Sequence, residues 1–370
     1  MSIARRLVPG RTHSASRRTA RRCFFLTPSA DVNQVVLYAL GLAVNRHGVD
    51  LHAFVAESTH HHTCATDDAP EARLSDFFET FHSLTARALN AHYGRGENFW
   101  CPGSYNNVEV FDKATLEEQL LYLWTNPVKD GLVERPEDWP GVKFLPEDFG
   151  RTVTVARPES AFFGGQRPTD WEPTHPDALA EFRRRRREVA RRAGGAAHRR
   201  DRGRRPPRPG ARPPKEPAPR PDRRDRRKLP TSVTFEITPP PGYDHMSLAE
   251  VRAYFRQLLD ARVAQILAER RAQGLTRVLG ADAVRNQNPR ESAGDTFPTF
   301  GRNPRIACRD QTRRIALLAE LVNWRVSYRV ARAAWRGGER DVAFPHGAYG
   351  LPRHHGAHVA PAATGPPTLE

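Results

Sequence analysis

Residues Val49–Thr63 read VDLHAFVAESTHHHT, and they set the architecture that we expect for this chain of 370 residues. Val49–Val55 is a short apolar run, which is typical of a buried strand. A turn at Glu57-Ser58-Thr59 follows, and a second strand begins at His60. Because the connection is so short, we expect the two strands to pair as antiparallel neighbours.

The histidine triplet at the start of the second strand is a candidate metal site. His60 and His62 are two residues apart, so in a strand their side chains point to the same face. Neutral imidazole binds several divalent ions, and one ion could contact both rings. His61 would face the other way. A surface tract of histidines gives the same pattern, so the triplet alone does not decide between a site and a tract.

Residues Thr115–Pro127 read TLEEQLLYLWTNP and predict a helix that carries a phenol and an amide. Thr115 begins a capping box, which is completed by a glutamate three residues later. Tyr122 and Asn126 are four residues apart and share one helix face, and Pro127 places Asn126 at or just past the helix end. With the two histidines, they would form a metal-assisted phosphoryl-transfer site with Tyr122 as nucleophile. An aromatic residue on an amphipathic helix is also compatible with a core position.

The order of the other predicted elements indicates the α+β class. Strand, helix, strand, strand, helix, strand and helix follow one another, which suits an antiparallel sheet with helices on one side. A mainly helical C-terminal region is expected to follow. The predicted segments are a strand at 23–27, helices beginning near 31 and 70, a strand at 105–111, a strand at 233–237, a helix beginning at the capping box of Ser247, and a helix at 315–335.

Positive charge is concentrated in two stretches. The formal net charge is +16, and residues 183–228 hold 21 Arg and Lys against 5 Asp and Glu, which accounts for all of it. The first 22 residues add seven arginines and no acid. This distribution predicts a polyanionic partner, with a basic arm at 1–20 that contacts DNA; an organellar transit peptide is the alternative for that arm. Trp100 and Tyr105 would either stack on unpaired bases or be buried.

Composition divides the chain into five segments. We expect a basic arm at 1–20, a nuclease domain at 21–150, a largely disordered Pro- and Arg-rich linker at 151–230, a mainly helical domain at 231–362 and a tail at 363–370. The four cysteines are widely spaced, which argues against a disulfide framework and favours the cytoplasm. No stretch is apolar for long enough to predict a membrane span.

Residues 21 to about 150 resemble the single-tyrosine HUH transposases, in the branch of REP-associated tyrosine transposases. Three stretches carry the resemblance: RCFFL at Arg22–Leu26, NFWCPGSY at Asn98–Tyr105 and YLWTNPVKDGLV at Tyr122–Val133, of which the last is the most specific. In the C-terminal part, FGRNPRIACRD at Phe300–Asp310 and FPHGAY at Phe344–Tyr349 look like segments of longer members.

The resemblance implies a ferredoxin-like HUH nuclease domain that acts on single-stranded or hairpin DNA. On this analogy His60 and His62 are ligands of Mg²⁺ or Mn²⁺, and Asn126 completes the metal site. Tyr122 attacks the scissile phosphate and leaves a 5'-phosphotyrosine. The 3'-hydroxyl could later rejoin the strands without an external energy source. The resemblance also implies a homodimer.

Several residues around the triplet depart from the pattern of that family. Thr59 and Thr63 stand where the family has an asparagine and an apolar residue, and His61 replaces an apolar residue between the two histidines. Glu57 occupies a position where an apolar residue is expected. Two functions therefore stay open. One is an active DNA transposase, and the other is an inactive or domesticated DNA-binding protein that retains the fold.

Overall fold

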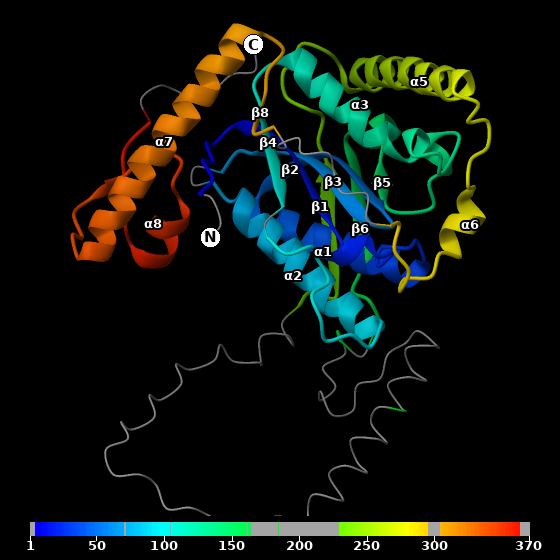
Figure 1. Cartoon of the computed structure of the whole chain (residues 1–370), viewed down its shortest axis with the longest axis horizontal. Helices are drawn as coiled ribbons and strands as arrows, with labels where there is room; N and C mark the ends of the chain where they lie inside the picture. Colours follow the sequence, from blue (N-terminus) through cyan, green and yellow to red (C-terminus); the bar gives the residue numbers. More distant parts are fainter. Residues whose placement is uncertain are drawn as a thin grey trace, which may run out of the picture. The chain divides into compact units, whose positions relative to one another are not determined.

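The computed structural model describes residues 4–69, 72–103, 105–160, 162–163, 184, 229–294 and 304–362 (Figure 1). The chain forms two compact units. Met1–Ala86, Asn98–Ala156 and Ser232–Glu370 make up the first unit, and Arg87–Glu97 with Arg157–Thr231 make up the second. The sheets and the site described below belong to the first unit.

A six-stranded sheet forms the centre of the first unit, with the order β5-β2-β3-β1-β4-β8. Neighbouring strands are antiparallel, except that β8 pairs with β4 in parallel. The described chain is thus a mixed α/β structure with a mostly antiparallel sheet. The strands are β1 (Arg11–Arg18), β2 (Val49–Glu57), β3 (His60–Asp67), β4 (Asn106–Val110), β5 (Lys143–Phe144) and β8 (Ile306–Ala307).

Helices cover both faces of this sheet, so the expectation of helices on one side is wrong. Alternate residues of β3 face opposite sides. His61 contacts Phe78, Phe81 and His82 of α2, whereas His60 and His62 contact α3. The helices are α1 (Ala30–His47), α2 (Leu74–His92), α3 (Lys113–Lys129), α5 (Leu248–Ala272), α6 (Ala281–Arg285), α7 (Gln311–Gly337) and α8 (Gly350–His355), with 3₁₀ turns η1 (Ala20–Arg22), η2 (Pro136–Asp138) and η3 (Pro146–Asp148).

The N-terminal residues form the strand between β3 and β4, which corrects the prediction of a basic arm at 1–20. Strand β1 is the segment Arg11–Arg18. It buries small polar side chains, so no apolar alternation identified it. The hydroxyls of Thr12 and Thr66 are 2.7 Å apart, and His13 Nδ1 lies 3.1 Å from the amide nitrogen of Asn107. The strand predicted at 23–27 is wrong as well, because those residues form a turn and a loop.

The residues after 231 complete the fold and do not form a separate domain. Strand β8 extends the main sheet, and β7 (Ser232–Ile237) pairs with β6 (Arg151–Ala156) in a small antiparallel sheet. Residues 151–156 are therefore a strand and not part of a linker, since β7 supplies the pairing that the local sequence lacks. Strands β9 (Ala343–Phe344) and β10 (His358–Val359) form another small sheet. The rest of the predicted linker and the tail at 363–370 lie outside the described residues, except for isolated positions.

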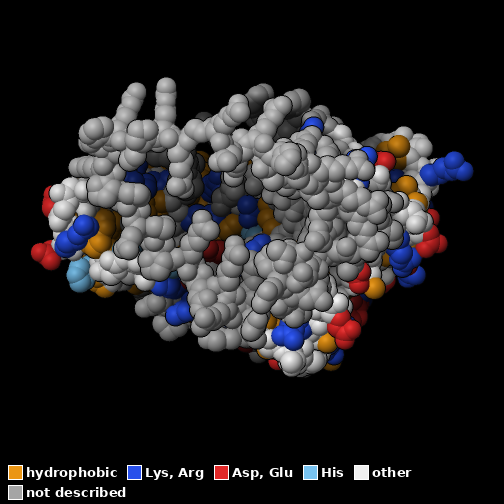
Figure 2. Space-filling view, turned by 90° about the horizontal axis from the view of Figure 1, so that it is seen from below, with side chains coloured by type: hydrophobic (Ala, Val, Ile, Leu, Met, Phe, Trp, Pro, Cys, Tyr) orange, Lys and Arg blue, Asp and Glu red, His pale blue; other side chains and the backbone are white. Residues whose placement is uncertain are grey.

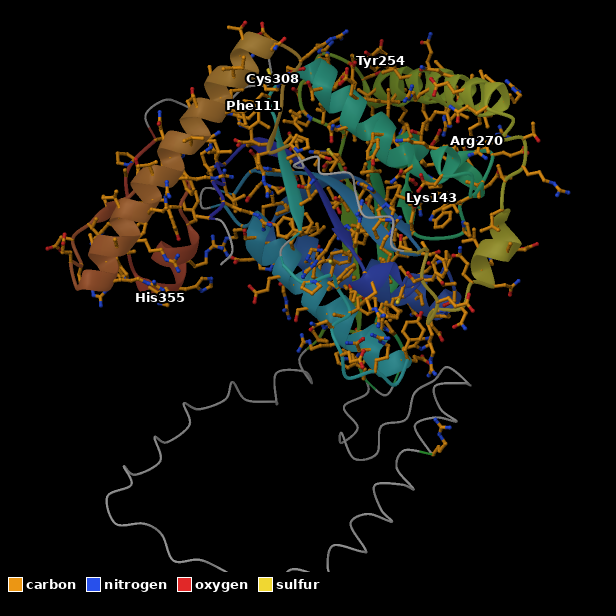
Figure 3. All side chains as sticks on the ribbon, viewed as in Figure 1. Phe111, Lys143, Tyr254, Arg270, Cys308 and His355 are labelled. Atoms are coloured by element: carbon orange, nitrogen blue, oxygen red, sulfur yellow. The ribbon has the colours of Figure 1, made fainter. Side chains whose placement is uncertain are left out.

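Helix α5 begins at the predicted capping box of Ser247 and Glu250, and it packs against α3. Its Phe255 ring lies 5.8 Å from that of Trp124 on α3. Near the other end of α5, the Arg270 guanidinium donates to the carbonyl of Lys129, at the last residue of α3 (Figure 3). Helix α5 thereby holds the C-terminal half of the helix that carries Tyr122.

A second apolar cluster surrounds α7. Phe111 and Cys308 lie close together in Figure 3, at the ends of β4 and β8. The Trp324 indole of α7 donates to the carbonyl of His346 at 2.6 Å. The buried members are Phe111, Ile306, Cys308, Leu317, Leu321, Trp324, Ala331, Phe344, Ala348 and Ala357.

Of the described helices, none combines the length and apolarity that crossing a membrane requires.

The contact between α1 and β7 gives a test of the fold. A Cβ atom at Gly41 would lie 2.5 Å from the Phe235 ring and 2.9 Å from Val233, whereas Gly337 on α7 has nothing within 4 Å. Both glycines are helical, so Gly→Ala gains similar helix propensity at each. We expect Gly41→Ala to be less stable than Gly337→Ala by about 1–3 kcal/mol, because it overpacks the core. Urea unfolding followed by circular dichroism measures the difference, and equal midpoints would contradict the packing.

Candidate active site

The turn between β2 and β3 presents two histidines to α3. In the ladder, His60 pairs with Glu57 and His62 pairs with Val55. The amide nitrogen of Asn126 lies 3.2 Å from His60 Nε2 and 2.9 Å from His62 Nε2. The two imidazole rings are 4.9 Å apart and nearly perpendicular. The Nε2 lone pairs therefore converge on one point, which the amide occupies.

Helix α3 places Asn126 and Tyr122 on the same face, as the spacing predicts. Asp112 is the N-cap and its side chain accepts from the Thr115 backbone, so the predicted capping box at Thr115 is wrong. The helix continues past Pro127 to Lys129, so Asn126 lies inside its last turn and not at its end. This is possible because a proline near a helix end disrupts few backbone hydrogen bonds.

Tyr122 lies beside the histidine pair and is accessible. Its side chain is 44% exposed, while Asn126 is buried. The phenol ring is 5.4 Å from the His62 ring and perpendicular to it. The ammonium of Lys129 lies 5.3 Å from the centre of the phenol ring. The structure thus brings together the four residues that the sequence singled out. Asn126 contacts His60 and His62, and His62 contacts Tyr122.

Burial keeps the two imidazoles neutral. It lowers the pKa of His62 to about 4, with a smaller contribution from Arg18. Burial also holds the pKa of His60 well below its usual value, assisted by His62 and Arg18. At neutral pH both Nε2 atoms then carry lone pairs, and the Asn126 amide can donate one N–H to each. Neutral imidazoles are the form that binds metals.

Two acids lie near the phenol. Glu57 is 2% exposed, its Oε2 is 3.9 Å from His60 Nε2, and its Oε1 has no hydrogen-bond partner among the described residues. Burial raises the pKa of Glu57 well above its usual value, and Asp130 adds to the shift. Burial also raises the pKa of Tyr122, with further contributions from Asp130 and Glu57. A positive charge in this region would relieve both effects.

The donor set fits a divalent cation. Two neutral imidazole nitrogens converge, a half-turn of the Asn126 amide would present an oxygen to the same point, and an unpaired carboxylate oxygen of Glu57 is nearby. Across the described ranges, no group of three or more His, Cys, Asp and Glu is arranged to hold a metal. An ion bound by His60 and His62 would therefore need the amide as a ligand.

His61 faces the other side and has a structural role. Its Nε2 is 2.8 Å from Nε2 of His82, and its Nδ1 is 3.1 Å from the hydroxyl of Thr63. The Trp100 indole donates to the carbonyl of His82 at 2.9 Å. Trp100 and Tyr105 are each 6% exposed, so of the two expectations for these aromatics the buried one holds.

Sequence reasoning missed the role of three charged residues at this site. Arg18, Glu57 and Asp130 each influence the pKa of Tyr122. Arg18 belongs to the segment that we expected to be an arm. Asp130 follows Tyr122 by eight residues, a two-turn spacing that could have identified it. The only sequence signal for Glu57 was an acid in an otherwise apolar strand.

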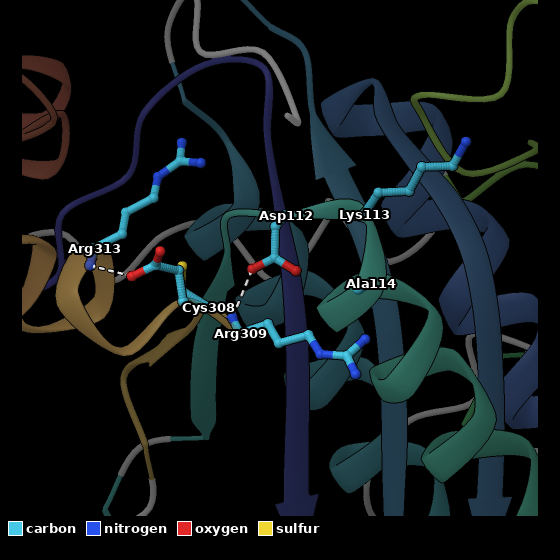
Figure 4. Close-up of a pocket in the computed structure, with 7 residues that line it drawn as sticks. Asp112, Lys113, Ala114, Cys308, Arg309 and Arg313 are labelled. Carbon is cyan, nitrogen blue, oxygen red and sulfur yellow. Dashed lines mark hydrogen bonds between the residues drawn. The ribbon is translucent and has the colours of Figure 1, made fainter.

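A cavity of about 520 Å³ lies elsewhere, at the starts of α3 and α7 (Figure 4). Its two carboxylates belong to helix N-caps: Asp112 caps α3 and also accepts from the backbone of Arg309, and Asp310 caps α7 by accepting from the backbone of Arg313. The lining residues are Asp112, Lys113, Ala114, Cys308, Arg309, Asp310 and Arg313. None of the four predicted site residues contributes to it. In Figure 2, which shows the molecule from below, basic and acidic side chains are interspersed among the described residues.

The contact between His61 and His82 gives a test of the structural role of His61. His82→Leu would leave the buried Nε2 of His61 without a partner, and we expect a loss of about 1–3 kcal/mol of stability. The double variant His61→Phe/His82→Leu removes the unpaired group and should recover part of the loss. Chemical unfolding of His82→Leu, His61→Phe and the double variant measures the coupling. Losses that simply add would contradict the hydrogen bond.

Two solved structures resemble parts of the chain. One is a REP-associated tyrosine transposase bound to a REP hairpin, with 21% identity, a TM-score of 0.35, and coverage of 40% of this chain and 85% of that chain. The other is a candidate transposase from Deinococcus radiodurans R1, with 20% identity, a TM-score of 0.24, and coverage of 29% and 85%. No known family model and no curated protein matches the chain. With TM-scores this low, these similarities carry no argument about function.

Proposed function

We propose that this protein is a DNA transposase of the single-tyrosine HUH type, which cleaves and rejoins single-stranded DNA. The observation that carries the proposal is the convergence of His60 and His62 on Asn126, with Tyr122 four residues earlier on the same helix. The strand order β2-β3-β1-β4, with helices after β1 and β3, also supports it. This is the order of the ferredoxin-like motif, on which HUH nucleases are built.

His60, His62 and Asn126 would hold the metal, Mg²⁺ or Mn²⁺. When bound, the ion would supply positive charge that polarises the scissile phosphate and offsets the charge developing on it. The Nδ1 atom of His60 lies 3.0 Å from the hydroxyl of Thr59, an interaction that fixes the ring orientation. Thr59 departs from the family pattern, but its hydroxyl would orient the His60 ring.

Tyr122 would act as the nucleophile. Its phenol oxygen forms a bond to phosphorus as the bond from phosphorus to the 3'-oxygen breaks. The phenol proton passes to solvent, and the leaving 3'-oxygen takes up a proton to become a hydroxyl. The products are a 5'-phosphotyrosine and a free 3'-hydroxyl. Attack by a 3'-hydroxyl on the phosphotyrosine reverses the step and joins strands, so no external energy source is needed.

The proposed partner is single-stranded or hairpin DNA. The excess positive charge of residues 183–228 would strengthen DNA binding by counterion release. We also propose a homodimer.

A second candidate is a DNA-binding protein that retains the fold but does not cut. The raised pKa of Tyr122, caused by its burial and by Asp130 and Glu57, favours this alternative, since a phenol that resists ionisation is a poorer nucleophile. Cleavage and binding must therefore be measured separately.

A labelled hairpin oligonucleotide with a single-stranded flank distinguishes the two functions. With Mn²⁺ the unaltered protein should form a covalent adduct that resists denaturation, and Tyr122→Phe should form none. Tyr328→Phe, on α7, is the matched control and should react normally, because that ring packs against Trp324 and Phe344 away from the site. Binding without an adduct by the unaltered protein would favour the second candidate.

His60→Ala and His62→Ala belong to the same experiment. Each should abolish the adduct and leave salt-sensitive DNA binding largely in place, because the metal contributes to chemistry more than to phosphate contacts. Cleavage by either variant would show that the metal assignment is wrong.

The pH dependence of metal binding tests the neutral imidazoles. With ordinary pKa values near 6.5, two histidine ligands would lose roughly a hundredfold in affinity between pH 7 and 5.5. Because burial lowers the pKa of His62 to about 4 and shifts that of His60 the same way, both should stay neutral over this range. We therefore expect Mn²⁺ affinity, measured by electron paramagnetic resonance, to change by less than about threefold. A hundredfold loss would contradict the site.

A further inference from the structure

We propose that Arg18 and Arg22 form a subsite for the scissile phosphodiester, beside His60 and opposite the helix that carries Tyr122. This inference rests on the proposed function and names the residues that would hold the substrate phosphate. It assigns to the N-terminal arginines a specific contact at the reacting group, in place of a diffuse attraction to DNA.

The register of the sheet places Arg18 at the site. Arg18 is the last residue of β1 and pairs directly with His60 of β3. Residues directly opposite in an antiparallel pair have their side chains on the same face. Two residues earlier, Ser16 is opposite His62. The face of the sheet that carries His60 and His62 therefore also carries a small residue beside His62 and a guanidinium beside His60.

Arg18 is exposed and, among the described residues, has no acidic partner. Its neighbour Arg17 points to the other face, where it donates to the carbonyl of Gly103 and lies 5.7 Å from the Trp100 ring. The two arginines are adjacent in sequence, and their side chains lie on opposite faces of the sheet. Arg17 is therefore a matched control for Arg18.

Electrostatic coupling supports this placement. Arg18 lowers the pKa of His60, His62 and Tyr122, although burial is the larger influence on all three. Arg22 lowers the pKa of His60 as well, and that of Asp130. These effects agree with the register, which places Arg18 beside His60. At Tyr122, Arg18 opposes the contributions of Asp130 and Glu57.

The turn that carries Arg22 is strained and held in place. Arg21 and Arg22 have φ angles of 55° and 53°, which residues other than glycine rarely adopt. The Thr19 hydroxyl donates to the carbonyls of Cys23 and Thr59, at 2.6 and 3.0 Å.

Residues after α6 hold the turn from the other side. The Ser292 hydroxyl donates to the carbonyl of Arg21 at 2.7 Å, and the Ala293 backbone donates to that of Arg22 at 3.2 Å. Strained backbone persists where its surroundings over-determine it, and it clusters at ligand sites. The hydrogen bond from Thr19 ties this turn to Thr59, the residue before His60.

Guanidinium chemistry suits this role. Its planar donors match two non-bridging phosphate oxygens, and it stays charged at all working pH values. Charge accumulates on those oxygens as the phenol attacks, so a fixed cation there stabilises the transition state more than the ground state. Arg18 would thus be a catalytic residue that touches the substrate, with Arg22 alongside it.

The experiment compares Arg18→Gln, Arg18→Lys and the control Arg17→Gln in the full-length protein. Single-turnover adduct formation with Mn²⁺ and the hairpin oligonucleotide should slow by about 100-fold or more in Arg18→Gln. Arg18→Lys should recover part of the rate, and Arg17→Gln should stay near the parent. Arg22→Gln should slow the reaction in the same direction. Thermal unfolding of each variant verifies that the fold is retained.

Binding gives a second readout that does not depend on cleavage. The affinity of Tyr122→Phe for the same oligonucleotide, measured against salt concentration, should lose about 0.7 from its logarithmic slope when Arg18→Gln is added, because one phosphate contact disappears. A parental rate and an unchanged slope in Arg18→Gln would overturn the subsite. If the unaltered protein forms no adduct, the proposed function fails, and the salt slope alone decides whether Arg18 binds phosphate.

Discussion

The hydrogen bonds from the Asn126 amide to the imidazoles of His60 and His62 connect helix α3 to the main sheet. Asn126 lies on α3, and His60 and His62 lie on β3, so these contacts join the helix to the sheet at the turn between β2 and β3. These contacts place Tyr122, one helical turn earlier, beside the histidines, and they require each Nε2 atom to accept a hydrogen bond, which only a neutral imidazole can do. Burial supplies that condition by lowering both pKa values.

Charge around this joint is arranged in two opposing sets. Glu57 and Asp130 raise the pKa of Tyr122, and Arg18 lowers it. Without a bound cation, burial and the two acids would keep the Tyr122 phenol protonated. A divalent ion and a bound phosphodiester would change the balance together, because the ion offsets the acids and the phosphate pairs with the arginines. On the proposed function, ionisation of Tyr122 would thus be coupled to the binding of substrate and metal.

The sequence singled out the four central residues because the spacing within each pair is local, while only the resemblance to a known family linked the strand pair to the helix pair. The two-residue period of a strand brings His60 and His62 together, and the four-residue period of a helix brings Tyr122 and Asn126 together. It failed where the structure depends on distant partners. Strand β1 lies inside the sheet although its sequence is polar, since Thr12 and His13 find their hydrogen-bond partners on β3 and β4. The placement of α5 and β8 also depends on residues more than 100 positions away, and the position of Arg18 opposite His60 follows from a register that no local pattern encodes.

Peptide mapping by mass spectrometry tests the central claim most directly. The protein would be trapped with a single-stranded hairpin oligonucleotide and Mn²⁺, digested, and searched for peptides that carry a nucleotide phosphate. The account predicts a 5'-phosphate ester on the peptide that contains Tyr122, formed only when the metal is present. Modification of a different residue, or an ester on Tyr122 that forms equally well in a chelator, would contradict it.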